Sequence, residues 1–546
     1  MTTFTLDCNK SMKRILLLMT CLILLGLPSL PARTESRSAR LGKWIEIENA
    51  ILKNLYSSYV DTLPTERMMK AGIKAMLEEL DPYTIYVPEE ENEDFELMIS
   101  HSYGGIGAII RKVPGSNVII NEPYEGSPAV KAGLQCGDEI IEVDGYPVLD
   151  LTAKESTERM KGKPGSRVVF KVKKVRSGKI VSVPVVRERI HLPDIVFAGM
   201  YNDTTGYIVQ TGFTSGVAKS LKEEVLKLKK KGMKRLVYDL RGNGGGLLNE
   251  AVDIVGLFVP KGSLVVTAKA FGEDQSAEYR TSSEPIDLQL PLTVLIDSGS
   301  ASASEIVSGA LQDMDRAVIA GKRSYGKGLV QHVMPVAYNG QLKVTVAKYY
   351  TPSGRCVQAI DYSHRNEDGS VGQIPDSLTH EFHTASGRIV RDGGGITPDI
   401  EIEGADYSRL VYSLVVNGIV DEYAIHYVQT HDKLPAPEAF SLSDEEFEDF
   451  VAFAKEKKFD SRSSAAALLD QMREALKKDG MAETACEELK ALESALKIDK
   501  EQFIRLKKQE IIPFIEEELA VRYHFQAAGV KIRMKYDEQL RKAIER

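Results

Sequence analysis

The sequence predicts an α/β protein of several domains with helical regions at both ends. Three observations lead to this prediction. From about 190 to 404, short apolar strands alternate with amphipathic helices, as in layered α/β folds. From 101 to 189 the strands are short and separated by glycine turns, and beyond Tyr407 the composition shifts to charged helices. A length of 546 residues suits three or four domains.

The first 32 residues are expected to be a signal peptide. Basic residues precede an apolar run from 15 to 27, and a short segment with two prolines ends at Ala32. The run is shorter than the roughly 18 to 20 residues that span a bilayer, so it predicts export. Because Leu30 stands where a cleavage site usually has a small residue, an uncleaved anchor in the inner membrane is the alternative. The expected location is the bacterial periplasm or cell envelope.

Three further regions surround the α/β core. Residues 42–100 are predicted to be helical, and 101–189 form a small β domain in which Tyr103-Gly-Gly-Ile-Gly107 precedes a strand. Residues 405–546 are predicted to be helical, and Ser443-Asp-Glu-Glu446 forms a capping box there. The later helices of this region are expected roughly at 463–478, 483–496 and 500–522. The sequence leaves three roles open for it: packing on the core, forming a homo-oligomer or binding an activating adaptor.

Composition restricts the classes of function. A net charge of −8 with 43% hydrophobic residues predicts a globular protein without a nucleic-acid partner. Of the five cysteines, two fall in the leader and three are scattered, which does not suit a disulfide framework. His380 and His383 lack the spacing of the zinc helix motif. No metal and no cofactor is therefore predicted.

A serine at the start of a helix is the central candidate for chemistry. The apolar run 292–296 predicts a buried strand, and the helical spacing of later apolar residues predicts a helix that begins near Ser302. Free N–H groups and the helix dipole favour negative charge there, which suits a nucleophile whose substrate becomes an oxyanion. The alternative is that Ser302 and Glu305 form only a capping box.

A lysine between two glycines supplies a candidate base. Gly326-Lys327-Gly328 lies between two apolar strands, where tight backbone is expected to press the lysine into a dry pocket. Desolvation lowers the pKa of an ammonium group from about 10.4 toward roughly 7 to 8, at which a lysine acts as a general base. Serine paired with lysine is a known alternative to the Ser-His-Asp triad.

A glycine-rich loop supplies candidate oxyanion donors. The strand 236–240 runs into Arg241-Gly-Asn-Gly-Gly-Gly246, and a helix is expected from 247 to 258. The N–H of Gly244, within the 244–246 glycines, and the N–H of Ala303 are predicted to form an oxyanion hole. The alternative, a phosphate-binding loop, fits neither the Walker nor the dinucleotide pattern.

These segments together resemble the carboxy-terminal processing proteases, the S41 serine peptidases with a PDZ domain. The motifs that carry the resemblance are Gly299-Ser-Ala-Ser-Ala-Ser-Glu305, Tyr325-Gly-Lys-Gly328, Asp239-Leu-Arg-Gly-Asn-Gly-Gly-Gly246 and Tyr349-Tyr-Thr-Pro-Ser-Gly-Arg355. The interval of 25 residues from Ser302 to Lys327 matches the family and selects Ser302 over the neighbouring serines. The resemblance implies Ser302 as nucleophile, Lys327 as base and Gln331 as the residue that holds the lysine amine.

The resemblance also implies the folds of two regions. For 190–404 it implies a crotonase- or ClpP-like spiral of ββα units, ending in the segment Ile396-Thr-Pro-Asp399. Asp313 corresponds to an acidic position that the family often carries, and the alternative is a solvated surface charge. No family resemblance is seen in the C-terminal helical region.

The glycine-rich β domain, 101–189, resembles an inserted PDZ domain. Such a domain adds a peptide as an extra strand and binds its terminal carboxylate through backbone N–H groups, here those of Gly104, Gly105 and Ile106. The alternative is a PDZ domain that only packs on the catalytic core. Where the family often has Arg-Gly after the second PDZ helix, this chain has Lys161-Gly162, a point charge in place of a planar fork.

The resulting prediction is an exported, PDZ-gated serine endopeptidase with a Ser-Lys dyad that cleaves polypeptides recognised by their C-termini. Three alternatives stay open. The first is a catalytically inactive PDZ adaptor of the cell envelope, and the second is a crotonase-like acyl-CoA enzyme. The third makes His332 the base; it is disfavoured because adjacent strand residues point to opposite faces, and Gln331 is expected to face Lys327.

Overall fold

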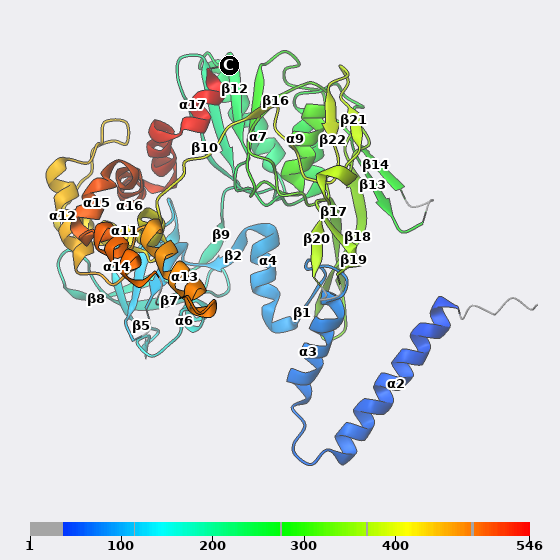
Figure 1. Ribbon diagram of the computed structural model, residues 1–546, viewed down its shortest axis with the longest axis horizontal. Coiled ribbons are helices and arrows are strands. Elements are labelled where there is room, and N and C mark those ends of the chain that lie inside the picture. Colours follow the sequence, from blue (N-terminus) through cyan, green and yellow to red (C-terminus); the bar gives the residue numbers. More distant parts are fainter. Residues whose placement is uncertain (1–35, 114, 273–275, 367–369, 482–484, 546) are drawn as a thin grey trace, which may run out of the picture. The chain divides into compact units, whose positions relative to one another are not determined.

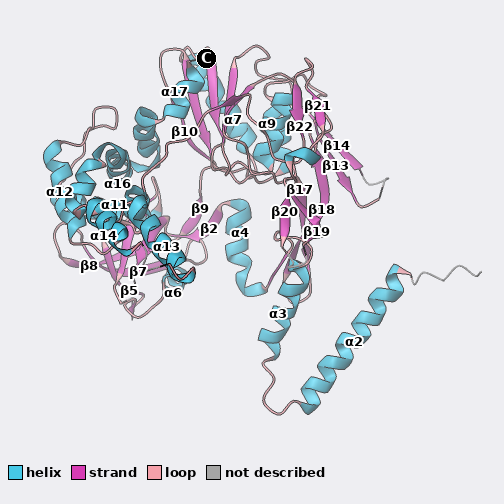
Figure 2. Cartoon of the chain, viewed as in Figure 1, coloured by secondary structure: helices cyan, strands magenta, loops and turns pink. Residues whose placement is uncertain are grey.

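The computed structural model describes residues 36–545, except 114, 273–275, 367–369 and 482–484 (Figures 1 and 2). The predicted leader, 1–32, lies outside the described residues, as do its cysteines Cys8 and Cys21. None of the helices described is both long enough and apolar enough to cross a membrane. The chain divides into two compact units, Met1–Met76 and Leu77–Arg546.

The N-terminal segment contains two helices, followed by a strand where a helix was predicted. Helix α2 (Arg37–Ser58) is capped by Ser36, whose hydroxyl accepts a hydrogen bond from the N–H of Ala39, and α3 (Thr65–Glu78) follows. The expectation that 42–100 is helical is wrong at β1 (Ile85–Val87), which pairs antiparallel with β18. The proline after Asp81 ends the helical pattern, and a short β-branched and aromatic run then extends a sheet edge.

The glycine-rich segment folds as one small sheet with two helices. The sheet has the order β3-β4-β5-β7-β8, with β6 paired to β5, so β3 is an edge strand. The elements are β3 (Ala108–Lys112), β4 (Val118–Pro123), α5 (Pro128–Lys131), β5 (Glu139–Val143), β6 (Tyr146–Pro147), α6 (Ala153–Met160), β7 (Arg167–Lys173) and β8 (Ile180–Val186). Alternate residues of β7 are buried, as expected for a sheet with one face in the core. A short pair, β2 (Ser102–Gly105) and β9 (Glu188–His191), brings the two ends of this segment together.

A six-stranded sheet forms the centre of the next region, in the order β10-β11-β12-β15-β16-β23. Its strands are β10 (Ile195–Met200), β11 (Thr205–Gln210), β12 (Arg235–Asp239), β15 (Leu292–Ile296), β16 (Val318–Gly321) and β23 (Ile400–Glu401). All neighbours are parallel except β10 and β11. In the five strands from β10 to β16, apolar residues enter two different cores, so both faces of the sheet are buried there.

Helices cover this sheet on both sides. The first core contains residues of α7 (Val217–Lys230), α8 (Leu248–Gly256) and α9 (Ala303–Asp313). The second core contains residues of α17 (Glu538–Ile544) and the end of α16 (Lys508–Tyr536), the red segments of Figure 1. The last helix of the chain is thus part of the same layered body as the sheet.

A second sheet lies beside the first and joins strands from distant parts of the chain. Its order is β1-β18-β13-β14, and β17 also pairs with β18. The strands are β13 (Leu264–Ala270), β14 (Ser276–Arg280), β17 (Leu329–Pro335) and β18 (Gln341–Tyr350). Two small hairpins follow, β19 (Ile360–Arg365) with β20 (Val371–Gln373) and β21 (Glu381–His383) with β22 (Ile389–Arg391).

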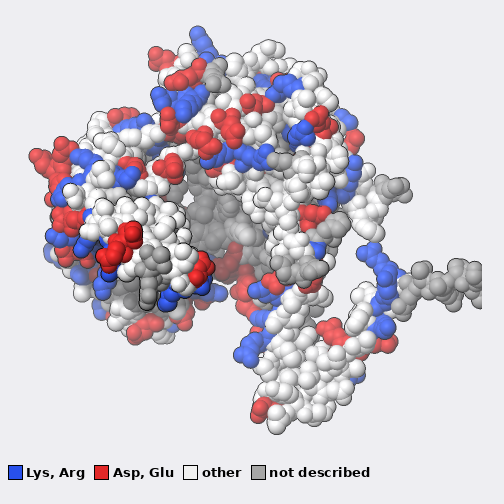
Figure 3. Space-filling view, in the orientation of Figure 1, with Lys and Arg blue, Asp and Glu red and all other residues white. Residues whose placement is uncertain are grey.

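The C-terminal region is helical, as predicted, with an aromatic core of its own. Its helices before α16 are α10 (Arg409–Val416), α11 (Ile419–Thr430), α12 (Asp444–Lys455), α13 (Ser464–Lys478), α14 (Cys486–Leu496) and α15 (Lys500–Leu506). The capping box of Ser443 and Glu446 starts α12 and directs Phe447 and Phe450 into the core. The single helix expected at 500–522 is wrong: α15 ends at Leu506, and α16 extends to Tyr536 with a kink at Phe525, whose φ of 64° and ψ of −178° are not helical. On the face seen in Figure 3, acidic and basic side chains are interspersed.

Candidate active site

One pocket of about 480 Å³ brings together the residues that the motifs singled out. Ser302, Lys327 and Gln331 line it, and so do the three glycines 244–246. The serine comes from the turn between β15 and α9, the lysine from the loop between β16 and β17, and the glycines from the loop between β12 and α8. Three segments that are distant in sequence therefore meet at the carboxyl ends of neighbouring parallel strands.

Ser302 precedes α9 in a conformation that a helix cap does not need. Its φ of 56° and ψ of −111° lie far from the extended region typical of N-cap residues. Such a backbone is strained for a residue with a Cβ and is retained where the surrounding structure holds it. The following residue, Ala303, starts the helix and is buried. The capping box of Ser302 and Glu305 does form, so the capping interpretation holds for this pair, and the role of Ser302 as nucleophile stays a prediction.

The Glu305 carboxylate ties the serine turn to the lysine loop. One oxygen, Oε2, accepts hydrogen bonds from the N–H groups of Ser302 (2.8 Å) and Lys327 (2.9 Å). The other, Oε1, accepts from the hydroxyl of Ser324 (2.6 Å) and the N–H of Gly326 (2.7 Å). Burial raises the pKa of Glu305, and these hydrogen bonds oppose that shift. The sequence showed this residue only as half of a capping box.

The environment of Lys327 favours the neutral form of its amine. Desolvation, and next the positive charge of Lys343, lower the pKa of Lys327 to about 8. Its Nζ lies 4.3 Å from the centre of the Tyr83 ring. Lys343, on β18, also lines the pocket. Neither Lys343 nor Tyr83 was identified from the sequence as a pocket residue. The alternation of apolar and polar residues along β18 was the signal that could have placed Lys343 on one face of that strand.

Gln331 lines the pocket from β17, but its amide bonds a different partner from the predicted one. Within the described part of the chain, its Nε2 donates to the hydroxyl of Thr345, at 3.4 Å. A bulge between Val330 and Gln331 shifts the register with β18. The role of Gln331 in holding the lysine amine stays a prediction.

His332 is exposed and lies outside the set of pocket residues, so the geometry does not favour it as the base.

The glycine loop lies directly against the serine turn. A Cβ on Gly245 would be 2.8 Å from Cβ of Ser302 and 2.9 Å from the nitrogen of Ala303, so only glycine fits there. The N–H of Gly245 already donates to the side chain of Asn243, at 2.9 Å. Its neighbour Gly244 therefore stays the predicted donor, together with Ala303, for an oxyanion in this pocket.

Asp313 lies at the end of α9 and is buried. Its Oδ1 forms an ion pair with Arg355 at 2.8 Å, and each side chain is 1% exposed. Its Oδ2 accepts a hydrogen bond from the N–H of Ser353. The solvated-surface alternative is therefore wrong. Through these bonds Asp313 stabilises the turn that follows β18. It lies outside the set of residues that line the pocket.

The predicted carboxylate-binding residues lie at the start of the small β domain. Gly104 and Gly105 belong to β2, which pairs with β9. The carbonyl groups of Gly104 and Ile106 accept hydrogen bonds from the N–H groups of Gly162 and Ala129. Strand β3 follows beside α6, and among the described strands it pairs only with β4. An edge strand next to a helix is the geometry that accepts an added peptide strand, and the individual N–H contacts stay a prediction.

Family models match three parts of the chain. Residues 204–364 match peptidase family S41, and 119–174 match the PDZ domain. Residues 410–546 match a model described as "Probable PDZ-protease, C-terminal helical domain". The expectation that no family resemblance extends into the C-terminal helical region is therefore wrong. Helical periodicity alone carries no motif by which this region is recognised.

Curated relatives agree with these matches. A "Carboxy-terminal-processing protease" of Bartonella bacilliformis is 34% identical over 317 residues, covering 57% of this chain and 71% of the relative. A "Probable CtpA-like serine protease" of Staphylococcus aureus is 34% identical, covering 57% of this chain and 62% of that protein. The solved photosystem II D1 C-terminal processing protease is 25% identical, with 66% of this chain and 86% of that chain covered and a TM-score of 0.37. The chain therefore belongs to the carboxy-terminal-processing proteases, serine peptidases of family S41 that carry a PDZ domain.

Proposed function

We propose that this protein is an exported, PDZ-gated endopeptidase in which Ser302 and Lys327 form the catalytic dyad. One observation carries the assignment of the dyad. The backbones of both residues are held by the same buried oxygen of Glu305, in a pocket where Lys327 has a pKa of about 8. A lysine with this pKa is partly neutral near pH 8 and accepts a proton.

The mechanism follows from this placement. Neutral Lys327 takes the proton of the Ser302 hydroxyl while Oγ attacks the scissile carbonyl carbon. The N–H groups of Ala303 and Gly244 stabilise the oxyanion, an effect of about 10²- to 10³-fold per donor in serine peptidases. The lysine ammonium then protonates the leaving amine, and the acyl-enzyme forms. Water hydrolyses the acyl-enzyme by the same sequence, with Lys327 again as the base.

Substitution of the dyad tests the assignment of the base. On an unstructured protein with an apolar free C-terminus, Ser302→Ala and Lys327→Ala should each lower the cleavage rate by at least about 10³-fold, since the two groups act as a unit. The matched control is His332→Ala, which should keep full activity because this side chain is exposed. Cleavage is followed by gel electrophoresis on variants shown to be folded by circular dichroism. Full activity of Lys327→Ala contradicts the dyad, and an inert wild type favours the adaptor alternative.

The pKa of Lys327 predicts a basic pH profile. Because the base must be neutral, kcat/KM should rise from pH 6 to 9 with a midpoint near 8. Replacing Lys343 by Met removes a repelling positive charge, so the pKa of Lys327 rises and the midpoint should move to higher pH.

Lys348→Met is the matched control for that shift, because Lys348 is exposed on the same strand. Its profile should coincide with that of the wild type. A midpoint that stays in place in Lys343→Met, or moves to lower pH, argues against Lys327 as the titrating base.

Two features support recognition of the substrate through its C-terminus and gating by the PDZ domain. Strand β3 lies beside α6 and, among the described strands, pairs only with β4, so a peptide strand fits there. Lys161, at the end of α6, forms an ion pair with Asp94 of α4 (Asn92–Ser100), at 2.7 Å. Met98 and Ile99 of the same helix line the pocket. A contact thus runs from the peptide-binding helix to the wall of the active site.

The identity of the C-terminal group should control cleavage. A substrate that ends in a free carboxylate should be cut at least about 10-fold faster than the same sequence ending in an amide, because backbone N–H groups favour the charged terminus. The comparison uses kcat/KM at substrate concentrations below KM. Equal rates for acid and amide would mean that the PDZ domain packs on the core without selecting termini.

Export is proposed from the leader sequence alone. A cleaved leader predicts that the protein recovered from the envelope fraction begins after Ala32, whereas an anchor predicts an intact N-terminus in the membrane fraction. Cell fractionation followed by N-terminal sequencing distinguishes the two. Recovery of the intact chain from the cytoplasmic fraction contradicts export.

A further inference from the structure

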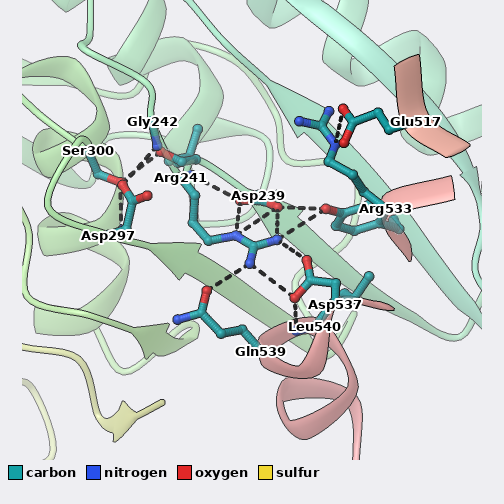
Figure 4. A network of polar contacts seen from close by, with 12 residues as sticks. Asp239, Arg241, Gly242, Asp297, Ser300, Glu517, Arg533, Asp537, Gln539 and Leu540 are labelled. Atoms are coloured by element: carbon teal, nitrogen blue, oxygen red, sulfur yellow. Dashed lines mark hydrogen bonds and ion pairs between the residues drawn. The ribbon is translucent and has the colours of Figure 1, made fainter. Parts of the chain in front are cut away.

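Arg241 connects the glycine loop to the C-terminus of the chain. It lies two residues after Asp239, the last residue of β12, and precedes the loop 242–246. Its guanidinium reaches the start of α17, where it bonds Asp537 and Gln539 (Figure 4).

The guanidinium is held by two carboxylates and an amide. Nε and Nη2 bond Asp239, at 3.0 and 2.6 Å. Nη1 donates to Oδ1 of Asp537 at 3.2 Å and to Oε1 of Gln539 at 2.9 Å, and Nη2 forms an ion pair with the Asp537 carboxylate. The Arg241 side chain is 17% exposed. Because the planar guanidinium is bonded through several of its N–H groups, it is held in one orientation. A lysine ammonium group in its place could not form the same set of bonds.

Helix α17 is fixed on the sheet, so it is a firm attachment point. Leu540 and Ala543 are buried in the core that also contains Val237, Leu295 and Ala320 of three sheet strands. The amide of Gln539 donates to the carbonyl of Ile402, at 2.6 Å. Asp537 also caps α17, because its Oδ1 accepts from the N–H of Leu540 at 2.8 Å.

The backbone on both sides of Arg241 is bonded to the turn that carries Ser302. The N–H of Gly242 donates to the side chain of Asp297, at 2.8 Å. The hydroxyl of Ser300 donates to the carbonyl of Leu240. The N–H of Ala301 donates to the carbonyl of Asn243, at 3.0 Å. A displacement of Arg241 therefore changes the position of the glycine loop relative to the serine.

We propose that α17 is a positioning element of the active site, in which Asp537 and Gln539 hold Arg241 and so set the path of the glycine loop. This inference rests on the proposed function, because it assigns the loop to the oxyanion hole. Arg241, Asp537 and Gln539 are positioning residues, since none of them lines the pocket. The C-terminal helical region is then required for chemistry even when the substrate is bound normally.

Asp537→Asn separates this role from helix capping. Asparagine caps a helix about as well as aspartate, so α17 should remain folded while its ion pair with Arg241 is lost. We expect kcat to fall about 10-fold, because small misplacements of catalytic groups have effects of this size or larger. KM should stay within about 2-fold, since substrate binding is unchanged. Gln539→Ala should show the same pattern in weaker form.

The matched control is Arg541→Ala, on the exposed side of the same helix. Its kcat, KM and thermal midpoint should equal those of the wild type. For Asp537→Asn the thermal midpoint should fall by no more than about 3 °C, because Asp239 still pairs with Arg241. An unchanged kcat in Asp537→Asn overturns the proposal. A kcat that falls only in parallel with the thermal midpoint also overturns it, because the contact is then merely stabilising.

Hydrogen exchange gives a readout that does not depend on activity. Amides of 240–248 should exchange about 10-fold faster in Asp537→Asn than in the wild type or in Arg541→Ala. If the wild type proves inactive, the proposed function fails while this exchange difference still supports the attachment of the loop to α17. Equal exchange in all three proteins overturns the attachment.

Discussion

The buried carboxylate of Glu305 is the interaction on which the active site depends. It accepts four hydrogen bonds: one from the N–H of Ser302 in the serine turn, and three from the lysine loop, donated by the hydroxyl of Ser324 and the N–H groups of Gly326 and Lys327. A buried carboxylate that loses a donor is left with an unpaired charge, at a cost of about 1–3 kcal/mol or more. Separation of the two loops is therefore unfavourable, and Ser302 and Lys327 are held in one pocket. The strained backbone of Ser302 is held by the same bonds.

Around this centre, the low pKa of Lys327 and the shape of the glycine loop have separate physical sources. Burial and the nearby charge of Lys343 lower the pKa of Lys327, while the ring of Tyr83 provides a weakly polar wall. The close approach of Gly245 to the serine turn gives the loop its shape. These groups come from β18, from the segment before β1 and from the loop after β12. The second sheet thus does more than add stability, because its strand β18 places the charge of Lys343 near Lys327 and lowers the pKa of that lysine.

The C-terminal helical region packs directly against the six-stranded sheet. A parallel sheet must be covered on both faces, and α17 with the end of α16 supplies one of the two covers. The same region contacts the PDZ domain, where Arg111 pairs with Glu422 of α11 and Arg522 of α16 bonds Asn121. The C-terminal helices therefore contact both the PDZ domain and β12, the strand that precedes the glycine loop.

The sequence by itself determined the local elements of this protein. A serine after a buried strand, a lysine between glycines and a glycine-rich loop were each visible, because strand and helix periodicity and turn residues are short-range signals. Only the tertiary structure decided which groups face one another. It showed Glu305 as a bridge, Lys343 as a pocket residue, Asp313 as buried and α17 as bound to Arg241. These pairings join segments up to about 300 residues apart, and they depend on which strand faces and helix ends meet, which no local pattern encodes.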